Sequence, residues 1–342
     1  MKNASVPTLE DVAREARVST ATVSRCLNSP ERVIEPTRDR VLSAVRKLGY
    51  YPNFGARALV AKRTNTYGAV IPTMDNAIFA KGIQAFQEAL HEKGKTLFIS
   101  SSSYREDIEE EQIRTLSARG ADGLLLIGHH RNDEIYKFLE KRGVPALAAW
   151  VYDPEQPRLS IGFDNRRAMK ELAKIVIARG HRKIAAISAP QATNDRARNR
   201  ILGIRDAMTE EGIPPESLQL IETAYGIETG ENAFRDLMAK PNKPTVVMCG
   251  NDVLAIGALQ GARHMGIQVP EDVSITGFDD IELASIADPE LTTVHVPHRE
   301  MGKRAAQMLI DMVEGTAPAN SIELMTRVCM RKSLAKPRDN DA

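Results

Sequence analysis

The sequence predicts an α/β protein, with a small N-terminal helical unit followed by a larger core of two lobes. Residues 8–49 carry three short amphipathic helical patterns. From residue 66 onward, short apolar runs alternate with helical segments, which is typical of parallel sheets covered by helices on both faces. The alternation begins again after Gly180, so two similar lobes are expected. At 342 residues, the chain is also too long for a single small core.

The three N-terminal helices have recognisable start and stop signals. Thr8 is followed three residues later by the carboxylate of Asp11, and this spacing is typical of a helix N-cap. We expect Ser19 to cap a second helix directly after a tight turn. The third helix has Pro36 in its first turn and ends at Gly49, which suits a left-handed C-cap. Its expected apolar face consists of Val41, Leu42, Val45 and Leu48.

Two short helices joined by a tight turn and braced by a third make a helix-turn-helix. Residues 1–63 contain 12 Lys and Arg against 6 Asp and Glu, a net charge of +6, while the remaining 34 and 39 give −5. The second helix is rich in hydroxyl side chains that can donate to phosphates, and Arg25 can offer a bidentate fork to guanine. The pattern therefore predicts that this basic unit binds double-stranded DNA.

The N-terminal unit resembles the DNA-binding head of the lac-repressor (LacI/GalR) family. Residues 8–13, 18–28, 48–53 and 56–59 match that head in order, spacing and residue type. The family usually has glycine where this chain has Arg17, so mild left-handed backbone strain is expected there. The resemblance implies that the following residues contact bases or the DNA backbone: Ser19, Thr20, Ala21, Thr22, Ser24, Arg25, Asn28 and Asn53.

The segment 53–63 is too short and too weakly amphipathic to form a stable helix alone. In the family, this segment is a hinge that folds when two copies meet on the operator. The leucine that corresponds to Leu59 then enters the minor groove and kinks the duplex. We therefore expect a DNA-binding domain over 1–52, a hinge over 53–63 and a core over 64–342.

The apolar runs of the core predict eight strands in two sets. The predicted strands are Tyr67–Ile71, Thr96–Ser100, Gly123–Ile127, Pro145–Ala149, Lys183–Ser188, Leu218–Ile221, Thr245–Cys249 and Val273–Thr276. The first lobe is expected at about 64–162 with a segment near 295–325. The second is expected at about 163–294 with a C-terminal segment. Ligands of such folds bind at the carboxyl ends of the strands.

The core also resembles the LacI/GalR family, through residues 180–184, 198–203, 249–258, 277–280 and 291–294. This resemblance implies a periplasmic-binding-protein-like core of parallel sheets flanked by helices, which binds a small carbohydrate between its lobes. The effector-binding residues it indicates are Trp150, Arg198, Tyr225, Asn251, Asp279 and His298. Their arginine, amide and carboxylate groups can share out the hydroxyls of a sugar between donors and acceptors.

Trp150 stands where sugar-binding members of the family often have an acidic residue. This loss of an acceptor, with Arg198 and Arg200 nearby, favours an anionic effector such as gluconate or a uronate. Residues 162–165 and 178–182 are similar to gluconate-operon repressors and favour the same class of ligand.

Several other classes of protein are disfavoured. The sequence has no phosphate-binding glycine motif and no G-x-S-x-G elbow. The three cysteines lie far apart, and the histidine pairs His129-His130 and His295/His298 are incomplete metal sets, so we expect no cofactor and no metal. No apolar run is long enough to span a membrane and no signal peptide precedes the head, which predicts a cytoplasmic protein.

The sequence therefore predicts a homodimeric transcriptional regulator, a repressor by analogy with the family, and not an enzyme. One alternative is a periplasmic sugar-binding protein, which would need a signal peptide and no helix-turn-helix. Another is a carbohydrate-processing enzyme, which would need paired carboxylates, and Asp279-Asp280 do not make a convincing pair.

Overall fold

The computed structural model describes residues 6–51, 63–75, 77–317 and 320–338 of the chain. Its internal contacts divide the chain into two units, Met1–Thr64 and Asn65–Ala342. Among the described residues, no helix is both long enough and apolar enough to cross a membrane.

The first unit is a bundle of short helices. It consists of α1 (Leu9–Ala16), α2 (Thr20–Asn28), the 3-10 turn η1 (Pro30–Arg32) and α3 (Glu35–Leu48). Thr8 and Asp11 form the expected capping box, and Ser19 caps α2 by accepting from the backbone N–H of Thr22. Gly49 ends α3 in the left-handed region with φ 64°. The predicted caps of all three helices are therefore confirmed.

The expectations for Arg17 and Leu42 had different outcomes. Arg17 adopts φ 52° and ψ 49°, so a non-glycine residue does occupy the left-handed position between α1 and α2. The prediction for Leu42 was wrong, because this residue is only partly buried and does not join the core that Val41 and Ala44 form. A helix returns to the same face after three or four residues, so Ala44, Val45 and Leu48 follow Val41 there.

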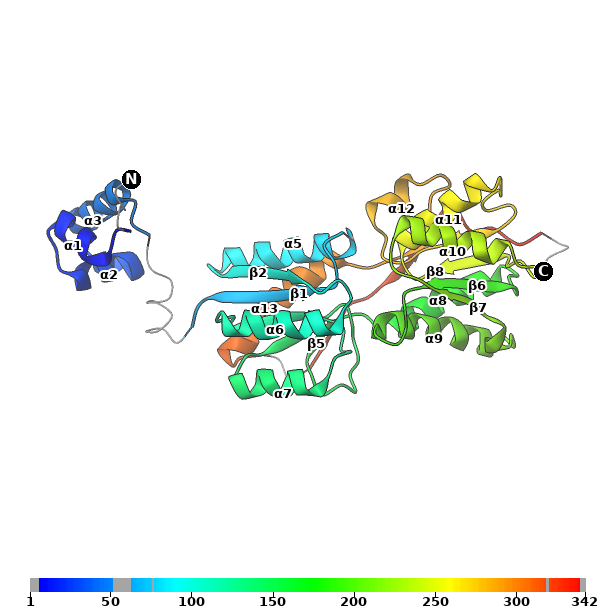
Figure 1. Ribbon diagram of the computed structural model, residues 1–342, viewed down its shortest axis with the longest axis horizontal. Helices are drawn as coiled ribbons and strands as arrows, with labels where there is room; N and C mark the ends of the chain where they lie inside the picture. The colour runs from blue at the N-terminus through cyan, green and yellow to red at the C-terminus, as the bar shows by residue number, and fades with distance from the viewer. Residues whose placement is uncertain (1–5, 52–62, 76, 318–319, 339–342) are drawn as a thin grey trace. The chain divides into compact units, whose positions relative to one another are not determined.

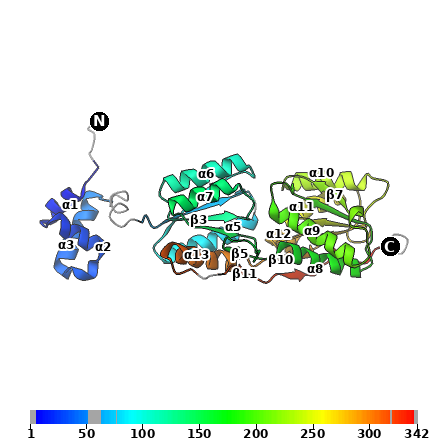
Figure 2. The ribbon, with the colours of Figure 1, turned by 90° about the horizontal axis from the view of Figure 1, so that it is seen from below.

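The first lobe of the second unit is built on a six-stranded parallel sheet. In spatial order its strands are β11 (Ile322–Glu323), β5 (Ser160–Gly162), β4 (Ala146–Ala149), β3 (Gly123–Ile127), β1 (Thr66–Ile71) and β2 (Thr96–Ser101). Alternate side chains of β1 face opposite helical layers, with Tyr67 and Ala69 on one side and Val70 on the other. The layers are α5 (Ala77–Glu92) with α13 (His298–Glu314), and α6 (Glu106–Ala118) with α7 (Asp133–Arg142) (Figures 1 and 2).

The second lobe repeats this plan with a four-stranded parallel sheet. Its strands are β7 (Gln219–Glu222), β6 (Ile184–Ser188), β8 (Val246–Cys249) and β9 (Ser274–Thr276), in that order. One face packs against α8 (Asn165–Ala178) and α9 (Asp195–Glu210), and the other against α10 (Ile227–Met238) and α11 (Asp252–His264). The short helices η2 (Pro215–Ser217) and α12 (Glu282–Ile286) lie in connecting segments.

The chain passes between the lobes three times. It leaves the first lobe after β5, returns to it after β10 (Thr293–His295), and leaves it again between β11 and β12 (Arg327–Cys329). β10 and β12 pair in an antiparallel ladder beside these crossings. Helix α13 and strand β11 therefore belong to the first lobe although they follow the second lobe in the sequence.

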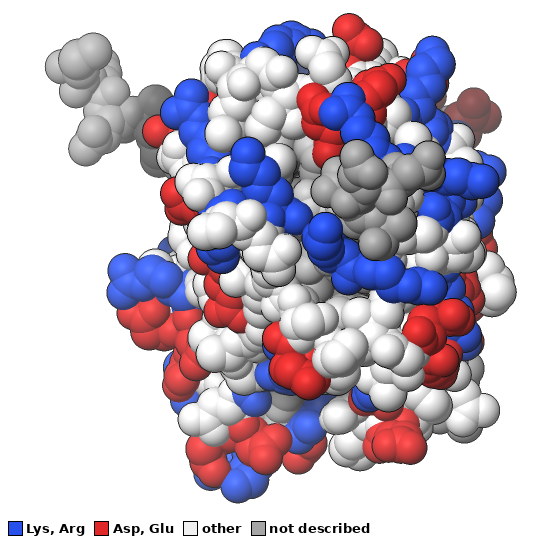
Figure 3. Space-filling model, turned by 90° about the vertical axis from the view of Figure 1, so that its right-hand side faces the viewer, with Lys and Arg blue, Asp and Glu red and all other residues white. Residues whose placement is uncertain are grey.

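Each of the eight predicted core strands is present, with ends that differ by at most one residue from the prediction. The sequence analysis missed β5, β10, β11 and β12, which are two or three residues long and too short for a periodic pattern. All strands in the two larger sheets are parallel, so their carboxyl ends lie together at the edges where the lobes meet. On the face shown in Figure 3, acidic and basic side chains are interspersed.

Candidate functional site

The solvent-facing side of α2 carries the predicted DNA-contacting residues. Val23 and Cys26 point into the helical core, which leaves the opposite face of the helix free. Of the predicted residues, five are exposed and two, Thr22 and Ser24, are partly exposed; the exposed ones are Ser19, Thr20, Ala21, Arg25 and Asn28. Two hydrogen bonds order the face: the hydroxyls of Ser19 and Thr22 lie 2.9 Å apart, and Asn28 Nδ2 donates to Ser24 Oγ at 3.2 Å.

The predicted contacts of Asn53 and Leu59 lie outside the described residues. The remaining seven predicted residues form one continuous polar surface on a single short helix and its cap. Such a helix can enter a major groove and present hydroxyls to phosphates and a guanidinium to a base edge. The role of each residue in DNA binding stays a prediction.

In the second unit, a narrow pocket lies between the two lobes at the carboxyl ends of their strands. The lobes line it with different kinds of side chain. The first lobe contributes Ile78, Phe79, Tyr104 and Trp150, and the second lobe contributes Asn194, Arg196, Arg200, Tyr225 and Asp279. One wall is therefore mostly aromatic and apolar, and the other is polar and charged.

Asp279 is the most unusual polar group in the cavity. It is fully buried, and neither carboxylate oxygen has a hydrogen-bond partner among the described residues. Arg200 is its nearest opposite charge, with 3.7 Å between Arg200 Nη2 and Asp279 Oδ1. Burial raises the pKa of Asp279 to about 6, although Arg200 and Arg196 oppose this rise. A buried acceptor without donors is suited to receive hydrogen bonds from a ligand.

The backbone around Asp279 is held in an uncommon conformation. Asp279 and Asp280 have φ values of 105° and 56°, in a region that side chains with a Cβ rarely adopt. The carboxylate of Asp280 accepts from Arg331 Nη2 at 2.6 Å and lies 2.8 Å from His295 Nδ1. The hydrogen bonds of Arg331 and His295 lower the pKa of Asp280 although burial opposes them. This anchoring holds the turn that directs Asp279 into the cavity.

The two arginines of the cavity are held by different partners. Arg196 Nη1 donates to the backbone oxygen of Ile127 at 3.0 Å and to Asp195 Oδ1 at 3.0 Å. Arg200 Nε donates to Asn165 Oδ1 at 2.9 Å, and its guanidinium lies 3.9 Å from the centre of the Phe278 ring. Both guanidinium groups are therefore fixed in position before any ligand arrives.

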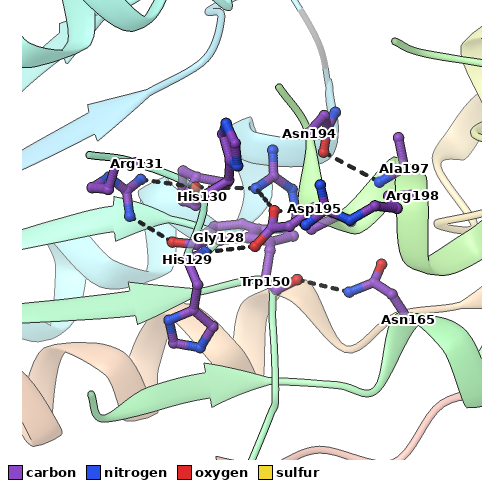
Figure 4. Close-up of polar contacts among 12 residues, drawn as sticks. Gly128, His129, His130, Arg131, Trp150, Asn165, Asn194, Asp195, Ala197 and Arg198 are labelled. Carbon is purple, nitrogen blue, oxygen red and sulfur yellow. Dashed lines mark hydrogen bonds and ion pairs between the residues drawn. The ribbon is translucent and has the colours of Figure 1, made fainter. Parts of the chain in front are cut away.

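Asp195 links the lobes beside the cavity. Its Oδ2 accepts from the backbone N–H of His129 at 2.6 Å, at the end of β3 in the first lobe (Figure 4). Gly128 precedes this contact with φ 73°, and a Cβ there would lie 2.0 Å from Arg196 Nη1. The close approach of the lobes at this point therefore requires glycine.

A second narrow pocket adjoins the first and shares Tyr104 and Arg196 with it. Its wall includes Glu106, Glu109 and His130, which pair with neighbouring side chains. In the described part of the chain, no three His, Cys, Asp or Glu residues gather where they could hold a metal ion.

The structure brings three of the six predicted effector residues, Trp150, Tyr225 and Asp279, to the cavity wall. His298 lies directly behind Trp150: it accepts from the indole Nε1–H at 3.1 Å, so its own Nε2 carries the proton that faces the Asp279 carbonyl at 3.3 Å. Burial lowers the pKa of His298 to about 4, so this imidazole is neutral at physiological pH.

Arg198 and Asn251 are not among the residues that line the cavity. Arg198 Nη1 donates to the backbone oxygen of Gln191 instead, and Asn251 caps α11 by accepting from Leu254 N. Arg196 and Arg200 take the expected place of Arg198, because residues four apart share a helix face and Arg198 lies on another. Helical spacing is the sequence signal that could have identified this pair.

The other lining residues that the sequence analysis missed are Ile78, Phe79, Tyr104 and Asn194. Tyr104 follows β2 by a few residues, and its ring lies 5.7 Å from that of Tyr225. No local motif marks these four positions, because they meet only when the two lobes come together.

Comparison with known proteins identifies both units. Residues 8–53 match the family of bacterial regulatory proteins, lacI family, and residues 173–334 match the periplasmic binding protein-like domain. The HTH-type transcriptional repressor PurR of Escherichia coli is 32% identical over 331 residues, which cover 96% of this chain and 97% of PurR.

Two solved structures extend this likeness to the whole fold. The lac repressor dimer bound to operator and the anti-inducer ONPF has a TM-score of 0.85 and 26% identity, over 96% of this chain and 99% of that one. The transcriptional regulator CelR in complex with cellobiose has a TM-score of 0.70 and 30% identity, over the same shares. The chain therefore belongs to the LacI family of DNA-binding transcriptional regulators that respond to small-molecule effectors.

Proposed function

We propose that this regulator is a homodimeric repressor whose affinity for operator DNA is controlled by a sugar acid bound between the core lobes. In this mechanism, two heads occupy the halves of a pseudo-palindromic operator. Residues 53–63 act as the hinge, and Leu59 enters the minor groove at the centre of the operator. The effector changes the relation of the lobes and thereby biases the hinge between its folded and unfolded states.

The observation that carries the choice of ligand is the chemistry of the cavity wall. Asp279 offers two buried carboxylate oxygens without donors, while Arg196 and Arg200 offer fixed N–H groups on the same wall. A polyhydroxylated acid satisfies both, since its hydroxyls donate to Asp279 and its carboxylate accepts from the arginines. Trp150 and Phe79 on the facing lobe suit the C–H face of the same molecule.

The ligand class is tested by titration of the full chain with D-gluconate, D-glucuronate and the neutral D-glucose. Calorimetry measures affinity, and the fluorescence of Trp150, the only tryptophan, reports on the cavity itself. We expect at least one acid to bind about tenfold or more tightly than glucose, because charged hydrogen bonds are stronger than neutral ones. Tight binding of neutral sugars alone would contradict an acidic effector.

The DNA arm of the proposal is tested by selecting operators from random duplexes and measuring affinity against salt concentration. Binding should weaken steeply as salt rises, because lysine and arginine contacts to phosphates release counterions. Added effector should either loosen the complex, as an inducer, or tighten it, as a corepressor. An operator affinity that is insensitive to every ligand bound by the core would contradict effector control.

The edge strand β2 is the feature of the core from which we infer the dimer interface. It has no strand on its outer side among the described residues, and Phe98 and Ile99 on it are 43% and 37% exposed. Unpaired edges with apolar side chains are ready sites for association. We expect Phe98→Asp to convert a dimer into monomers in sedimentation velocity. Ile227→Asp, at a similarly exposed (40%) position in the second lobe, is the matched control that should leave the dimer intact.

A further inference from the structure

The buried side-chain amide of Asn165 forms hydrogen bonds with one residue from each wall of the cavity, Arg200 and Trp150. Asn165 is the first residue of α8, and its side chain is almost fully buried, with 2% of the residue exposed. It does not line the cavity. The sequence analysis placed it in the motif 162–165 but not among the predicted effector-binding residues.

Asn165 uses its two ends for different partners. Its Oδ1 accepts from Arg200 Nε at 2.9 Å. Its Nδ2 donates to the backbone oxygen of Trp150 at 3.1 Å (Figure 4). A weaker bond runs from Nδ2 to the backbone oxygen of Phe163 at 3.4 Å. The partners fix the orientation of the amide, because a guanidinium can only donate and a carbonyl can only accept.

The hydrogen bonds of Asn165 stabilise the conformations of both Trp150 and Arg200. Trp150 has φ 59°, a left-handed conformation that costs a bulky residue free energy unless its surroundings hold it. Arg200 is 5% exposed, and its plane is determined by Asn165, the Gly250 carbonyl and the face of Phe278. Loss of the amide would leave the Trp150 carbonyl and the Arg200 Nε–H buried without the partner each has now.

We propose that Asn165 is a positioning residue for effector recognition, which aligns Arg200 on the second lobe and Trp150 on the first lobe through one carboxamide. It acts through these two residues and does not touch the ligand. Its link to affinity rests on the proposed binding of a sugar acid, whereas its effect on Trp150 does not require any ligand.

The ligand-free test uses the emission and acrylamide quenching of Trp150 in the full chain. Asn165→Ala should shift the emission to longer wavelength and raise the quenching constant, because the indole and its strand end lose their anchor. Asp164→Ala is the matched control: it removes the N-cap of α8 at the preceding residue, which accepts from Arg167 N at 2.9 Å. That variant should lower the melting temperature and leave Trp150 emission unchanged.

The ligand test uses D-gluconate in a double-mutant cycle with Arg200→Lys. Asn165→Ala should weaken gluconate binding about tenfold or more in the wild-type background, as expected when a buried charged group loses a partner. In the Arg200→Lys background the same change should cost clearly less, because no guanidinium plane remains to be aligned and only the effect through Trp150 is left. Equal losses in the two backgrounds would overturn action through Arg200.

The fluorescence test and the gluconate-binding test distinguish failure of the proposed role of Asn165 from failure of the proposed ligand class. If gluconate does not bind the wild-type chain, the proposed ligand class fails and the fluorescence arm alone decides the role of Asn165. Unchanged emission and quenching in Asn165→Ala would overturn that role. Asn165→Ser, which is too short to reach both partners, replaces the alanine variant if the latter does not fold.

Discussion

The two lobes of the core share one architecture but give the effector cavity opposite chemistry. The first lobe supplies Ile78, Phe79, Tyr104 and Trp150, and the second supplies Asn194, Arg196, Arg200, Tyr225 and Asp279. Sheets of the same topology thus present a wall for stacking on one side and a wall for hydrogen bonding on the other. If the proposed effector binds here, we expect the second lobe to determine which ligand binds and the first lobe to cover it.

The largest expected effect comes from removing the charge of the polar wall. Asp279→Asn should weaken gluconate binding about a hundredfold or more, because two charge-assisted hydrogen bonds are lost. The same change should stabilise the free protein at pH 7. The folded-state pKa of Asp279 is about 6 against a usual value of 3.8, so its ionisation costs up to about 3 kcal/mol of folding free energy. Calorimetry and urea unfolding measure the two effects, and a variant that is both weaker in binding and less stable would contradict this account.

Substitutions in the aromatic wall of the first lobe should reduce gluconate affinity less than substitutions in the polar wall. Trp150→Leu should weaken gluconate binding about thirtyfold, since a large aromatic contact surface and the support of His298 are both lost. Phe138→Leu, which removes a half-buried aromatic residue of α7 outside the cavity, is the control and should leave affinity unchanged. If Trp150→Leu reduced affinity more than Asp279→Asn, the division between the walls would be reversed.

The contact between the lobes can be tested by a substitution at Gly128, which does not itself line the cavity. In Gly128→Ala, the new Cβ would lie 2.0 Å from Arg196 Nη1 and 2.5 Å from Asp195 Oδ1, so these side chains must give up their present positions or the lobes must move apart. We expect about a tenfold loss of affinity, which corresponds to about 1.4 kcal/mol. Gly143→Ala is the matched control, because Gly143 has a similar φ of 66° but no atom within 4 Å of the added Cβ. Equal loss of affinity in both variants would attribute the effect to backbone strain alone.

The smallest effect is the pH dependence of the polar wall. Asp279 must be ionised to accept hydrogen bonds with both oxygens, so affinity should fall as pH drops through about 6. At pH 5.5 a loss of about fourfold relative to pH 7.5 is expected from simple titration of one group. Stability should move the other way and rise on acidification between about pH 6 and 4, because the folded state then binds more protons than the unfolded state. The pH dependence of affinity should be absent in Asp279→Asn.

The sequence predicted those features that depend on neighbouring residues. Caps at Thr8, Ser19 and Gly49 follow from local spacing, and so do the core strands of four or more residues. The short strand β5 was missed because its three residues are defined by their neighbours β4 and β11 rather than by their own pattern.

The effector cavity was predicted only in part, since its walls are assembled from distant segments. The family resemblance indicated Trp150, Tyr225 and Asp279, and all three line the cavity, while their contact with an effector stays a prediction. The choice of Arg198 failed to place an arginine in the cavity because it followed a motif and not the geometry of helix α9, on which Arg196 and Arg200 share a face. Asn165 was noted only as part of the motif 162–165, because its hydrogen bonds to Arg200 and Trp150 depend on how distant segments pack together.

The three crossings between the lobes also affect how the chain acquires its structure during synthesis. The sheet of the first lobe lacks its edge strand β11, and its cover α13, until the ribosome has passed residue 323. The second lobe waits longer, because Ser333 bonds the backbone oxygen of Ile275 and the N–H of Thr292. The helical head, by contrast, is held by contacts within its first fifty residues. A nascent chain can therefore display a folded head long before its core is able to sense an effector.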